Sequence, residues 1–455
     1  MKRFLGRLDD QPMPEGEKRP EKGKAGTQEK RERRPRIVPT VSARLDSGEV
    51  VELVYKPRER QTRFLVWKDG DVREKRRLRH LDDRLLVPFS PENNLLSRGV
   101  VLFPEEASGY ESESALIEEV RGFIHRYVDL SELFEEISTY YVLFTWIYDD
   151  FNELAYLRVR GDYGTGKSRF LLTVGSLCYK PIFAGTATVS PLFRILDSVR
   201  GTLVIDEGDF RLSDEKAEII KILNNGNARG FPVLRSEQDP RTKEFNPRAF
   251  EVFGPKLIAT RGYFEDRALE SRTITEELRG GPVRADIPLN LPHCFHKEAR
   301  MLRDKLLVYR FRKLGRTRDL AAVVDRTLEP RLNQVFAPLA STIAASETRE
   351  RLRELARRAG EELSSERSLA VEAQVLEVVK TLRDAGEPLA LQTIARRFQA
   401  EHGAEYQRPI TPRWIGFVLR QKLGLSPRKS HGTFIVPLAD DPALARLFDR
   451  YGLNE

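Results

Sequence analysis

The chain has 455 residues, an apolar content of 40% and a formal net charge of +8. This length suffices for two to four domains, and two cysteines exclude a disulfide-rich secreted scaffold. No apolar run is long enough to cross a bilayer, and the first residues lack the apolar core of a signal peptide. We therefore expect a soluble, cytoplasmic protein without a membrane partner.

The amino-acid composition of the chain changes near residue 36. Residues 1–36 are rich in Lys, Arg, Glu, Pro and Gly and almost free of apolar residues after Leu8, which predicts a disordered basic tail. Residues 37–110 alternate apolar and polar positions between turn sequences such as Asp46-Ser-Gly, which predicts a small β-rich module. This module carries no chemical motif, so it either binds a partner or DNA, or packs on the rest of the chain.

Residues 111–152 predict a helical segment that leads into the next domain. Apolar residues recur at helical spacing from Ala115 to Val128, and a second, aromatic-rich helix is expected over Leu130–Phe151. Its aromatic side chains fall on most faces of the helix, which is typical of a buried helix. We therefore expect these aromatics in the core and not in a platform that stacks on bases.

A glycine-rich turn follows the strand-like run Leu154–Val159 and precedes a helix pattern. It reads Gly161-Asp162-Tyr163-Gly164-Thr165-Gly166-Lys167-Ser168, which is the P-loop pattern GxxxxGK[ST] in the context that it requires. The three glycines allow positive φ angles and close approach to phosphate, and the loop amides face the anion. We expect Lys167 to reach the β- and γ-phosphates of ATP, Ser168 to bind Mg²⁺, and the loop with the adjacent Arg169 to hold the nucleotide.

A second motif supports nucleotide hydrolysis. The apolar run from Gly201 ends in two carboxylates, Asp206 and Glu207, which is a Walker B pattern. Asp206 is expected to hold the Mg²⁺ shell, and Glu207 to polarise the water that attacks the γ-phosphate. Strands and helices alternate around these motifs, so residues 153–296 predict an α/β P-loop core with a parallel sheet. Its further elements are expected at Lys180–Gly185, Ser190–Val199, Asp214–Leu223 and Lys256–Thr260.

A hairpin is predicted between the Walker B strand and the strand that ends at Thr260. Its arms are Gly230–Arg235 and Lys243–Phe253. The cations Arg235, Arg241 and Lys243 suit the phosphate backbone of DNA, which needs no base contacts. The alternative is an ordinary polar surface hairpin.

Two arginines follow Thr260 near the edge where the phosphates are expected. If subunits assemble head to tail, one of them reaches the γ-phosphate of the neighbouring subunit as an arginine finger. Arg272 is preferred for this role over Arg267. The alternative for each is a local salt bridge.

The remaining sequence predicts three segments: a charged helical linker at 297–366, a winged helix at 367–438, and a C-terminal helix or tail at 439–455. The winged helix comprises helices at Ala370–Ala385, Leu391–His402 and Thr411–Leu423, then a basic two-stranded wing. Its third helix is expected in the major groove of DNA, with the wing beside it. The cations expected to contact DNA are Arg413, Arg420, Arg428 and Lys429. The alternative is a module that docks a protein.

Together these motifs resemble a known family over residues 130–280. The segment is similar to the AAA+/superfamily-3-type helicase domain of phage and mobile-element replication proteins, often fused to a primase. The resemblance rests on Asp206 lying 38 residues after Ser168, on a basic hairpin before the strand FGPKLIAT, and on the following Ser271-Arg272. The C-terminal winged helix fits it as well.

The resemblance implies an AAA+-like core and specific roles for its residues. Thr260 corresponds to the sensor-1 polar residue, where many relatives have Asn. Arg272 corresponds to the trans arginine finger, and Arg241 and Lys243 to hairpin residues that face a central DNA channel. The P-loop and Walker B residues have the roles given above.

The implied function is an ATP-dependent DNA helicase or translocase that acts on single-stranded DNA as a homo-oligomeric, hexameric ring. It would serve the replication of a phage, plasmid or integrated mobile element. Residues 37–105 are too few for a primase-polymerase domain, so a primase or polymerase is expected on a separate chain. One alternative is an ATP-switched DNA-binding assembly factor, such as an initiator, helicase loader or transposition regulator. Another is a defence or signalling ATPase whose winged helix docks a protein.

Overall fold

The computed structural model of the chain describes residues 35–79, 82–185, 189–206, 214–238, 242–264, 266–316, 318–368, 371–403, 410–430, 432–437 and 440–453. The predicted tail, residues 1–36, lies outside this range except for its last two residues. Glu207 and Arg241, both predicted site residues, also lie outside it. Within the described part of the chain, no helix is long and apolar enough to cross a membrane.

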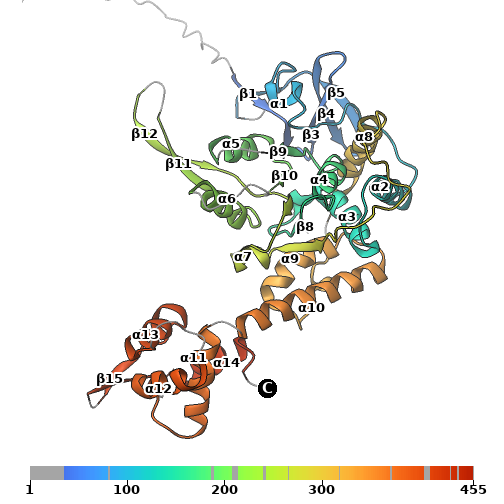
Figure 1. Cartoon of the computed structure of the whole chain (residues 1–455). Helices are drawn as coiled ribbons and strands as arrows, with labels where there is room; N and C mark the ends of the chain where they lie inside the picture. The colour runs from blue at the N-terminus through green and yellow to red at the C-terminus, as the bar shows by residue number, and fades with distance from the viewer. Residues whose placement is uncertain are drawn as a thin grey trace, which may run out of the picture.

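A five-stranded parallel sheet forms the centre of the molecule (Figure 1). All neighbouring strands run parallel, and their inner strands are buried, as parallel sheets require. The register pairs Ala259 with Asp206 and Thr260 with Arg160, so the carboxyl ends of three strands meet at one edge. The predicted α/β core is confirmed at this level. From one edge to the other the strands are β14 (Thr273–Glu277), β8 (Tyr156–Arg160), β13 (Lys256–Thr260), β10 (Leu203–Asp206) and β9 (Ile182–Ala184).

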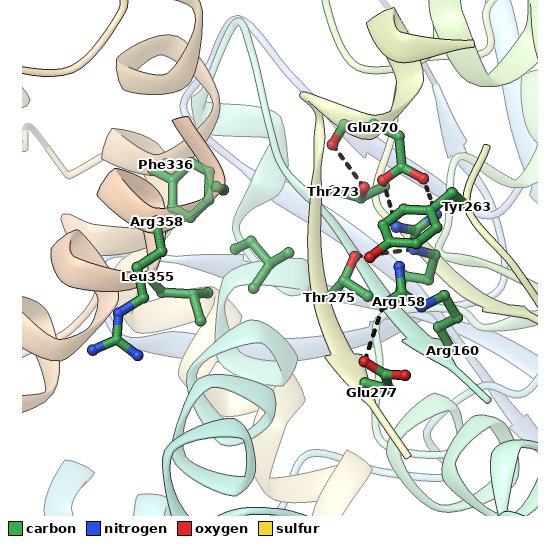
Figure 2. Close-up of a pocket in the computed structure, with 12 residues that line it drawn as sticks. Arg158, Arg160, Tyr263, Glu270, Thr273, Thr275, Glu277, Phe336, Leu355 and Arg358 are labelled. Carbon is green, nitrogen blue, oxygen red and sulfur yellow. Dashed lines mark hydrogen bonds and ion pairs between the residues drawn. The ribbon is translucent and has the colours of Figure 1, made fainter. Parts of the chain in front are cut away.

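The edge strand β14 is attached through a buried arginine (Figure 2). Arg158 of β8 is 1% exposed, and its guanidinium donates to Glu270 Oε1 at 2.9 Å and to Thr275 Oγ1 at 3.0 Å. The second guanidinium nitrogen donates to the other carboxylate oxygen of Glu270, so the ion pair is bidentate. Because a buried arginine needs such a partner, this contact fixes β14 and the residues before it against the sheet.

Helices pack against the sheet. Helix α4 (Lys167–Gly175) packs against β8, β10 and β13, and α2 and α3 pack on α4. The aromatic-rich helix is buried nearly all round, as predicted, but it ends at Thr145 and not at Phe151. At this end of the helix the indole of Trp146 donates to the Leu177 carbonyl at 2.9 Å. The other elements of this region are α2 (Glu113–Tyr127), α3 (Glu132–Thr145), η1 (Tyr148–Asp150), α5 (Val189–Val199), α6 (Asp214–Asn225) and α7 (Arg267–Glu270).

The N-terminal region is β-rich, as predicted, and it packs on the central domain. The Phe183 amide donates to the Val100 carbonyl at 2.9 Å, and Val101 forms a β-bridge with Ile182. One continuous apolar core extends from Val41 in this region through the central domain. The N-terminal region contains two sheets. The first is antiparallel and consists of β2 (Ser42–Arg44), β3 (Val50–Lys56), β4 (Gln61–Lys68) and β5 (Asp71–Lys75). The second is mixed and consists of β1 (Arg36–Thr40), β7 (Arg84–Pro88) and β6 (Leu78–Arg79), and α1 (Asn94–Ser97) follows it in the chain.

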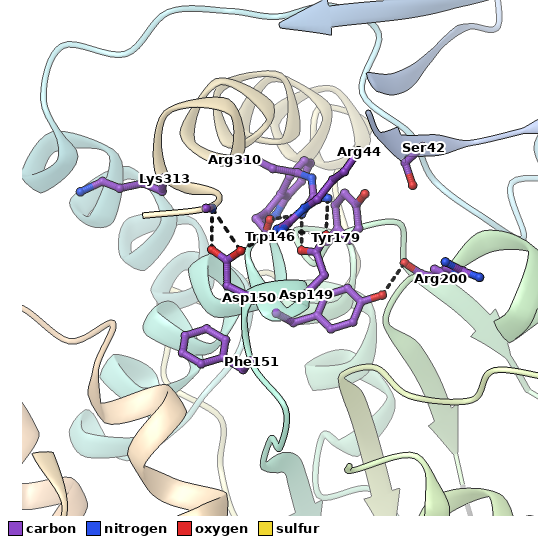
Figure 3. Close-up of polar contacts among 12 residues, drawn as sticks. Ser42, Arg44, Trp146, Asp149, Asp150, Phe151, Tyr179, Arg200, Arg310 and Lys313 are labelled. Atoms are coloured by element: carbon purple, nitrogen blue, oxygen red, sulfur yellow. Dashed lines mark hydrogen bonds and ion pairs between the residues drawn. The ribbon is translucent and has the colours of Figure 1, made fainter. Parts of the chain in front are cut away.

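A buried ionic network joins the two regions (Figure 3). Arg310 of α8 (Phe295–Lys313) donates to Glu52 at 2.7 Å and to the two carboxylate oxygens of Asp149 at 2.7 and 2.8 Å. Glu52 also accepts a hydrogen bond from the Tyr179 hydroxyl at 2.7 Å. Burial alone would raise the pKa of Asp149, but the charge and hydrogen bonds of Arg310 lower it to about 2.

The C-terminal part forms a lobe with its own apolar core. The predicted helix Leu391–His402 is confirmed, and the third helix begins where predicted, since the Thr411 hydroxyl accepts from the Trp414 amide at 3.2 Å. A short antiparallel hairpin follows it. The elements from α9 onward are α9 (Pro330–Ala340), α10 (Ser346–Ser368), α11 (Val371–Asp384), α12 (Leu391–His402), α13 (Pro412–Phe417), the π-helical turn η4 (Val418–Lys422), β15 (Arg428–Ser430), β16 (Thr433–Ile435) and α14 (Asp441–Arg450), with η2 (Ala321–Val323) before them.

Candidate nucleotide-binding site

The turn between β8 and α4 is shaped to hold an anion. Gly164 and Gly166 have φ angles of +75° and +93°, which favour glycine. Gly161 does not lie in this region, so the prediction of a positive φ is wrong there. A side chain at Gly161 would instead approach the Leu278 carbonyl oxygen to 2.5 Å, so close packing requires this glycine. Helix α4 begins at Lys167, and its first amides are free of helical partners and can bind an anion.

The predicted magnesium ligands lie together. Ser168 Oγ donates to Asp206 Oδ2 at 3.2 Å, which joins the start of α4 to the end of β10. A hydroxyl and a carboxylate are oxygen ligands of the kind that Mg²⁺ prefers, so this pair fits the ion.

Lys167 lies over the loop that precedes it. Its Nζ donates to the carbonyl oxygens of Gly161 at 2.7 Å and Asp162 at 2.6 Å. Burial lowers the pKa of Lys167, while the charge of Asp206 opposes that shift. The ammonium group is thus at the P-loop, on a flexible side chain that can exchange carbonyl partners for phosphate.

A cavity of about 750 Å³ opens over these groups. A second hollow of about 550 Å³ adjoins it and shares Gly164, Thr165 and Gly166. The second hollow continues between residues 129–131 and 276–283. Both volumes are in the range of ligand pockets. The first cavity is lined by Tyr163, Gly164, Thr165, Gly166, Lys167, Ser168, Arg169, Gly185, Asp206 and Arg261.

Two arginines of the first cavity differ in how they are held. Arg169, predicted to bind nucleotide, donates to the backbone carbonyls of Pro288 at 2.9 Å and Leu289 at 2.6 Å. Arg261 was not among the predicted site residues, yet its guanidinium lines the cavity and lies over the Tyr163 ring, 3.8 Å from the centroid. The signal in the sequence is its position directly after the strand that ends at Thr260.

The residues predicted beyond β13 are held within their own subunit. The buried Thr260 donates its hydroxyl to the Gly262 carbonyl at 2.8 Å. Arg272 donates from Nη1 to Asn224 Oδ1 at 2.6 Å and to the Ala268 carbonyl at 2.7 Å, and burial lowers its pKa. Arg267 begins α7, and its side chain lies outside the described part of the structure, as does all of Glu207.

The predicted hairpin is present as β11 (Val233–Gln238) and β12 (Phe245–Phe250), and it extends beyond the central sheet (Figure 1). Arg235 does not lie free on it, because Nη2 is 3.2 Å from a Glu218 carboxylate oxygen on α6. Lys243, close to the tip, is exposed, and it has no ion pair with any residue that the structure describes. Arg241 lies outside the described residues.

The four predicted DNA-contacting cations of the C-terminal lobe are exposed. Arg413 and Arg420 lie on the third helix and its last turn, and Arg428 and Lys429 on β15. None of these four cations forms an ion pair with a residue that the structure describes. By contrast the nearby Lys422 is 2.9 Å from Glu372.

The sequence matches no protein-family profile and no curated protein. Among solved structures, the chain is similar to the C-terminal region of NrS-1, with 11% identity over 85% of this chain and 95% of that chain, and a TM-score of 0.33. It is also similar to JCV helicase, with 13% identity over 54% and 60% of the two chains and a TM-score of 0.23. Drosophila ORC bound to DNA matches at 11% identity over 76% and 95%, with a TM-score of 0.17. Similarity at this level assigns neither a family nor an activity.

Proposed function

We propose that the chain binds ATP with Mg²⁺ at the P-loop and hydrolyses it. The observation that carries this proposal is the Ser168–Asp206 hydrogen bond of 3.2 Å. It brings the expected ligands of Mg²⁺ to one point beside the anion-binding loop, and Mg²⁺ would neutralise charge that develops on the phosphates. Lys167 would bind the β- and γ-phosphates, and the hollow beside residues 276–283 would take the ribose and base. Glu207, directly after Asp206, would orient the water.

The strand order supports an AAA+-like core. Strand β13 lies between β8, which leads into the P-loop, and β10, which ends in Asp206. The residues that follow β13 therefore approach the phosphates from between these two motifs. This is the place that the resemblance gives to a sensor residue.

We further propose that the partner is DNA, and that the chain is a helicase or translocase that forms a hexameric ring. Four exposed cations on the C-terminal lobe, which have no ion pair with any residue that the structure describes, support DNA binding, because phosphate contacts need free Lys and Arg. The three helices and the β15–β16 hairpin have the elements of a winged helix, with α13 in the major groove. The exposed Lys243 supports a DNA-contacting hairpin. A primase or polymerase would be supplied by another chain.

The deciding experiment measures unwinding of a forked duplex beside ATP hydrolysis with and without single-stranded DNA, for wild type and Glu207→Gln. We expect wild type to hydrolyse ATP faster with DNA and to separate the strands, and Glu207→Gln to do neither. Hydrolysis stimulated by DNA without strand separation would instead favour an assembly factor. Hydrolysis indifferent to DNA would contradict a nucleic-acid partner, and no ATP binding would contradict the nucleotide site itself.

A second candidate function is an ATP-switched DNA-binding assembly factor. The observation in its favour is that two cations needed by a ring helicase are engaged within the chain. Arg272 binds Asn224 and the Ala268 carbonyl, and Arg235 pairs with Glu218.

Arg272→Ala tests the arginine finger. We expect the variant to bind ATP normally and to lose turnover by about a thousand-fold, because a finger acts on the transition state of the neighbouring subunit. Mixing it with Glu207→Gln subunits should restore part of the activity. Arg331→Ala is the matched control, since Arg331 donates to the same Ala268 carbonyl at 3.1 Å. Equal losses in both variants, without rescue, would show that Arg272 is a local structural residue.

Lys243→Ala tests the hairpin. We expect weaker binding to DNA of any sequence, and a plot of log affinity against log salt that is shallower by about one, because one phosphate contact is lost. Nucleotide binding should not change. Lys221→Ala, which removes an exposed lysine on α6, is the control. An unchanged salt slope for Lys243→Ala would contradict a role in holding the DNA backbone.

A further inference from the structure

Two crossed arginine–tyrosine stacks join the loops that follow β8 and β13. Arg160, the last residue of β8, lies over the ring of Tyr263 with its guanidinium carbon 3.6 Å from the centroid (Figure 2). Arg261, the first residue after β13, lies over the ring of Tyr163 in the P-loop at 3.8 Å. Each strand thus sends an arginine onto a tyrosine of the other strand's loop.

The two arginines have different surroundings. Arg160 also donates to a Glu277 carboxylate oxygen at 3.1 Å and lines the cavity of Figure 2, away from the P-loop. Arg261 lines the nucleotide cavity with Lys167. Judged on the described residues, the Tyr163 ring is the partner of the Arg261 guanidinium, and no carboxylate pairs with it. Stacking uses the flat face of the group, so its N–H donors remain directed outward from the edge.

The neighbouring groups cannot replace Arg261. Arg169 donates to the carbonyls of Pro288 and Leu289. Thr260, the predicted sensor, donates to the Gly262 carbonyl at 2.8 Å and so fixes the turn that carries Arg261. The Thr260 hydroxyl thus binds a backbone carbonyl, while the side chain of the next residue, Arg261, lines the cavity.

The register of the sheet places Arg261 at the far end of the phosphate chain. Ala259 pairs with Asp206 and Thr260 pairs with Arg160, which precedes the P-loop. The residue after Thr260 therefore lies between the P-loop and the proposed Mg²⁺ ligand. In a P-loop site this is the position of the γ-phosphate, since Mg²⁺ bridges the β- and γ-oxygens.

We propose that Arg261 binds the terminal phosphate of the nucleoside triphosphate held by its own subunit, and that Tyr163 holds it beside the site when that phosphate is absent. This inference rests on the proposed function. A guanidinium is permanently charged and binds phosphate oxygens through paired donors. A nucleoside diphosphate has no phosphate group at that position, so Arg261 favours binding of the triphosphate over the diphosphate.

The test is calorimetric titration of wild type and variants with Mg²⁺ and either ADP or an ATP analogue that has a non-hydrolysable β–γ bridge. Arg261→Ala should weaken binding of the analogue by about 10- to 100-fold, the usual effect of losing a charged hydrogen bond, and binding of ADP by less than about 3-fold. Arg261→Lys, which keeps the charge, should recover part of the loss. Arg160→Ala is the matched control, since it removes the other stack, and should change neither affinity by more than about 3-fold.

The outcomes separate this inference from the function on which it rests. Failure of wild type to bind either nucleotide would overturn the nucleotide site. Normal binding by wild type, with Arg261→Ala changing both affinities equally or neither, would overturn the role of Arg261 alone. A melting curve for each variant checks the fold, and if Arg261→Ala melts early, Arg261→Gln provides the same comparison of the two nucleotides.

Discussion

Replacing Lys167 with alanine should lower ATP hydrolysis by about 100- to 1000-fold or more. The ammonium group lies within 2.7 Å of the P-loop carbonyls of Gly161 and Asp162, and its side chain can reach a phosphate held by the same loop. A positioned cation stabilises the charge that develops in phosphoryl transfer, and removing one such group commonly has an effect of this size. Affinity for the ATP analogue should fall as well.

Phosphate release under saturating ATP measures the effect, and calorimetry measures the affinity. Lys221→Ala is the control, because it removes an exposed lysine on α6 while leaving the cavity intact. Turnover by Lys167→Ala at the rate of the control would exclude the P-loop as the catalytic site. A melting curve equal to that of wild type would show that a loss is chemical and not a failure to fold.

Arg310→Met should destabilise the folded chain by about 3–5 kcal/mol. The guanidinium holds the buried carboxylate of Glu52 and the partly buried carboxylate of Asp149, at 2.7 Å each. Removal of Arg310 takes away the bidentate partner of Asp149. It leaves the buried Glu52 carboxylate to the Tyr179 hydroxyl and to Lys180, which is 3.5 Å away. Loss of one member of such a network costs more than the network itself contributes. The variant should therefore unfold at a lower urea concentration than wild type. Arg312→Met, on the exposed face of the same helix, is the control, and we expect a change of about 0.5 kcal/mol or less.

The pH dependence gives an independent check on Arg310. The pKa of Asp149 is about 2 in the folded chain, which is below the ordinary value of an aspartate. Its contribution to stability is therefore present above about pH 4 and is lost as the pH falls toward 2. Arg310→Met should flatten this part of the stability profile. Equal unfolding midpoints for Arg310→Met and Arg312→Met would show that the network contributes nothing.

The parts of the site that are local in sequence were predictable. The strand, turn and helix around Lys167 follow from a short pattern, and the helix that begins after Thr411 follows from its cap and the proline beside it. The strands of the central sheet were recognised where apolar runs were long and bounded by glycine. The edge strand β14 was missed because Thr273–Glu277 is short and ends in two acids.

The rest of the site depends on contacts between residues far apart in the chain. Gly161 is required by the Leu278 carbonyl, and Arg272 is held by Asn224, 48 residues away. Arg235 on β11 pairs with Glu218 on α6. The sequence marks Arg261 through its position after the strand that ends at Thr260 and through no motif, so its place in the cavity follows from the pairing of β13 with β8. Sequence patterns therefore predicted the local strand, turn and helix geometry better than the long-range contacts that position the side chains.

The contact between the N-terminal region and β9 limits how such a chain could evolve by recombination. Residues before 111 contain none of the nucleotide motifs, yet Glu52 pairs with Arg310 and Lys180, and the Val100 carbonyl accepts from the Phe183 amide on β9. A gene fragment that began at residue 111 would encode every motif of the site, but it would remove the Glu52 partner of Arg310 and Lys180 and leave the edge of β9 open to association. We infer that recombination at this point would not transfer a stable central domain, and that the two regions are inherited as one unit.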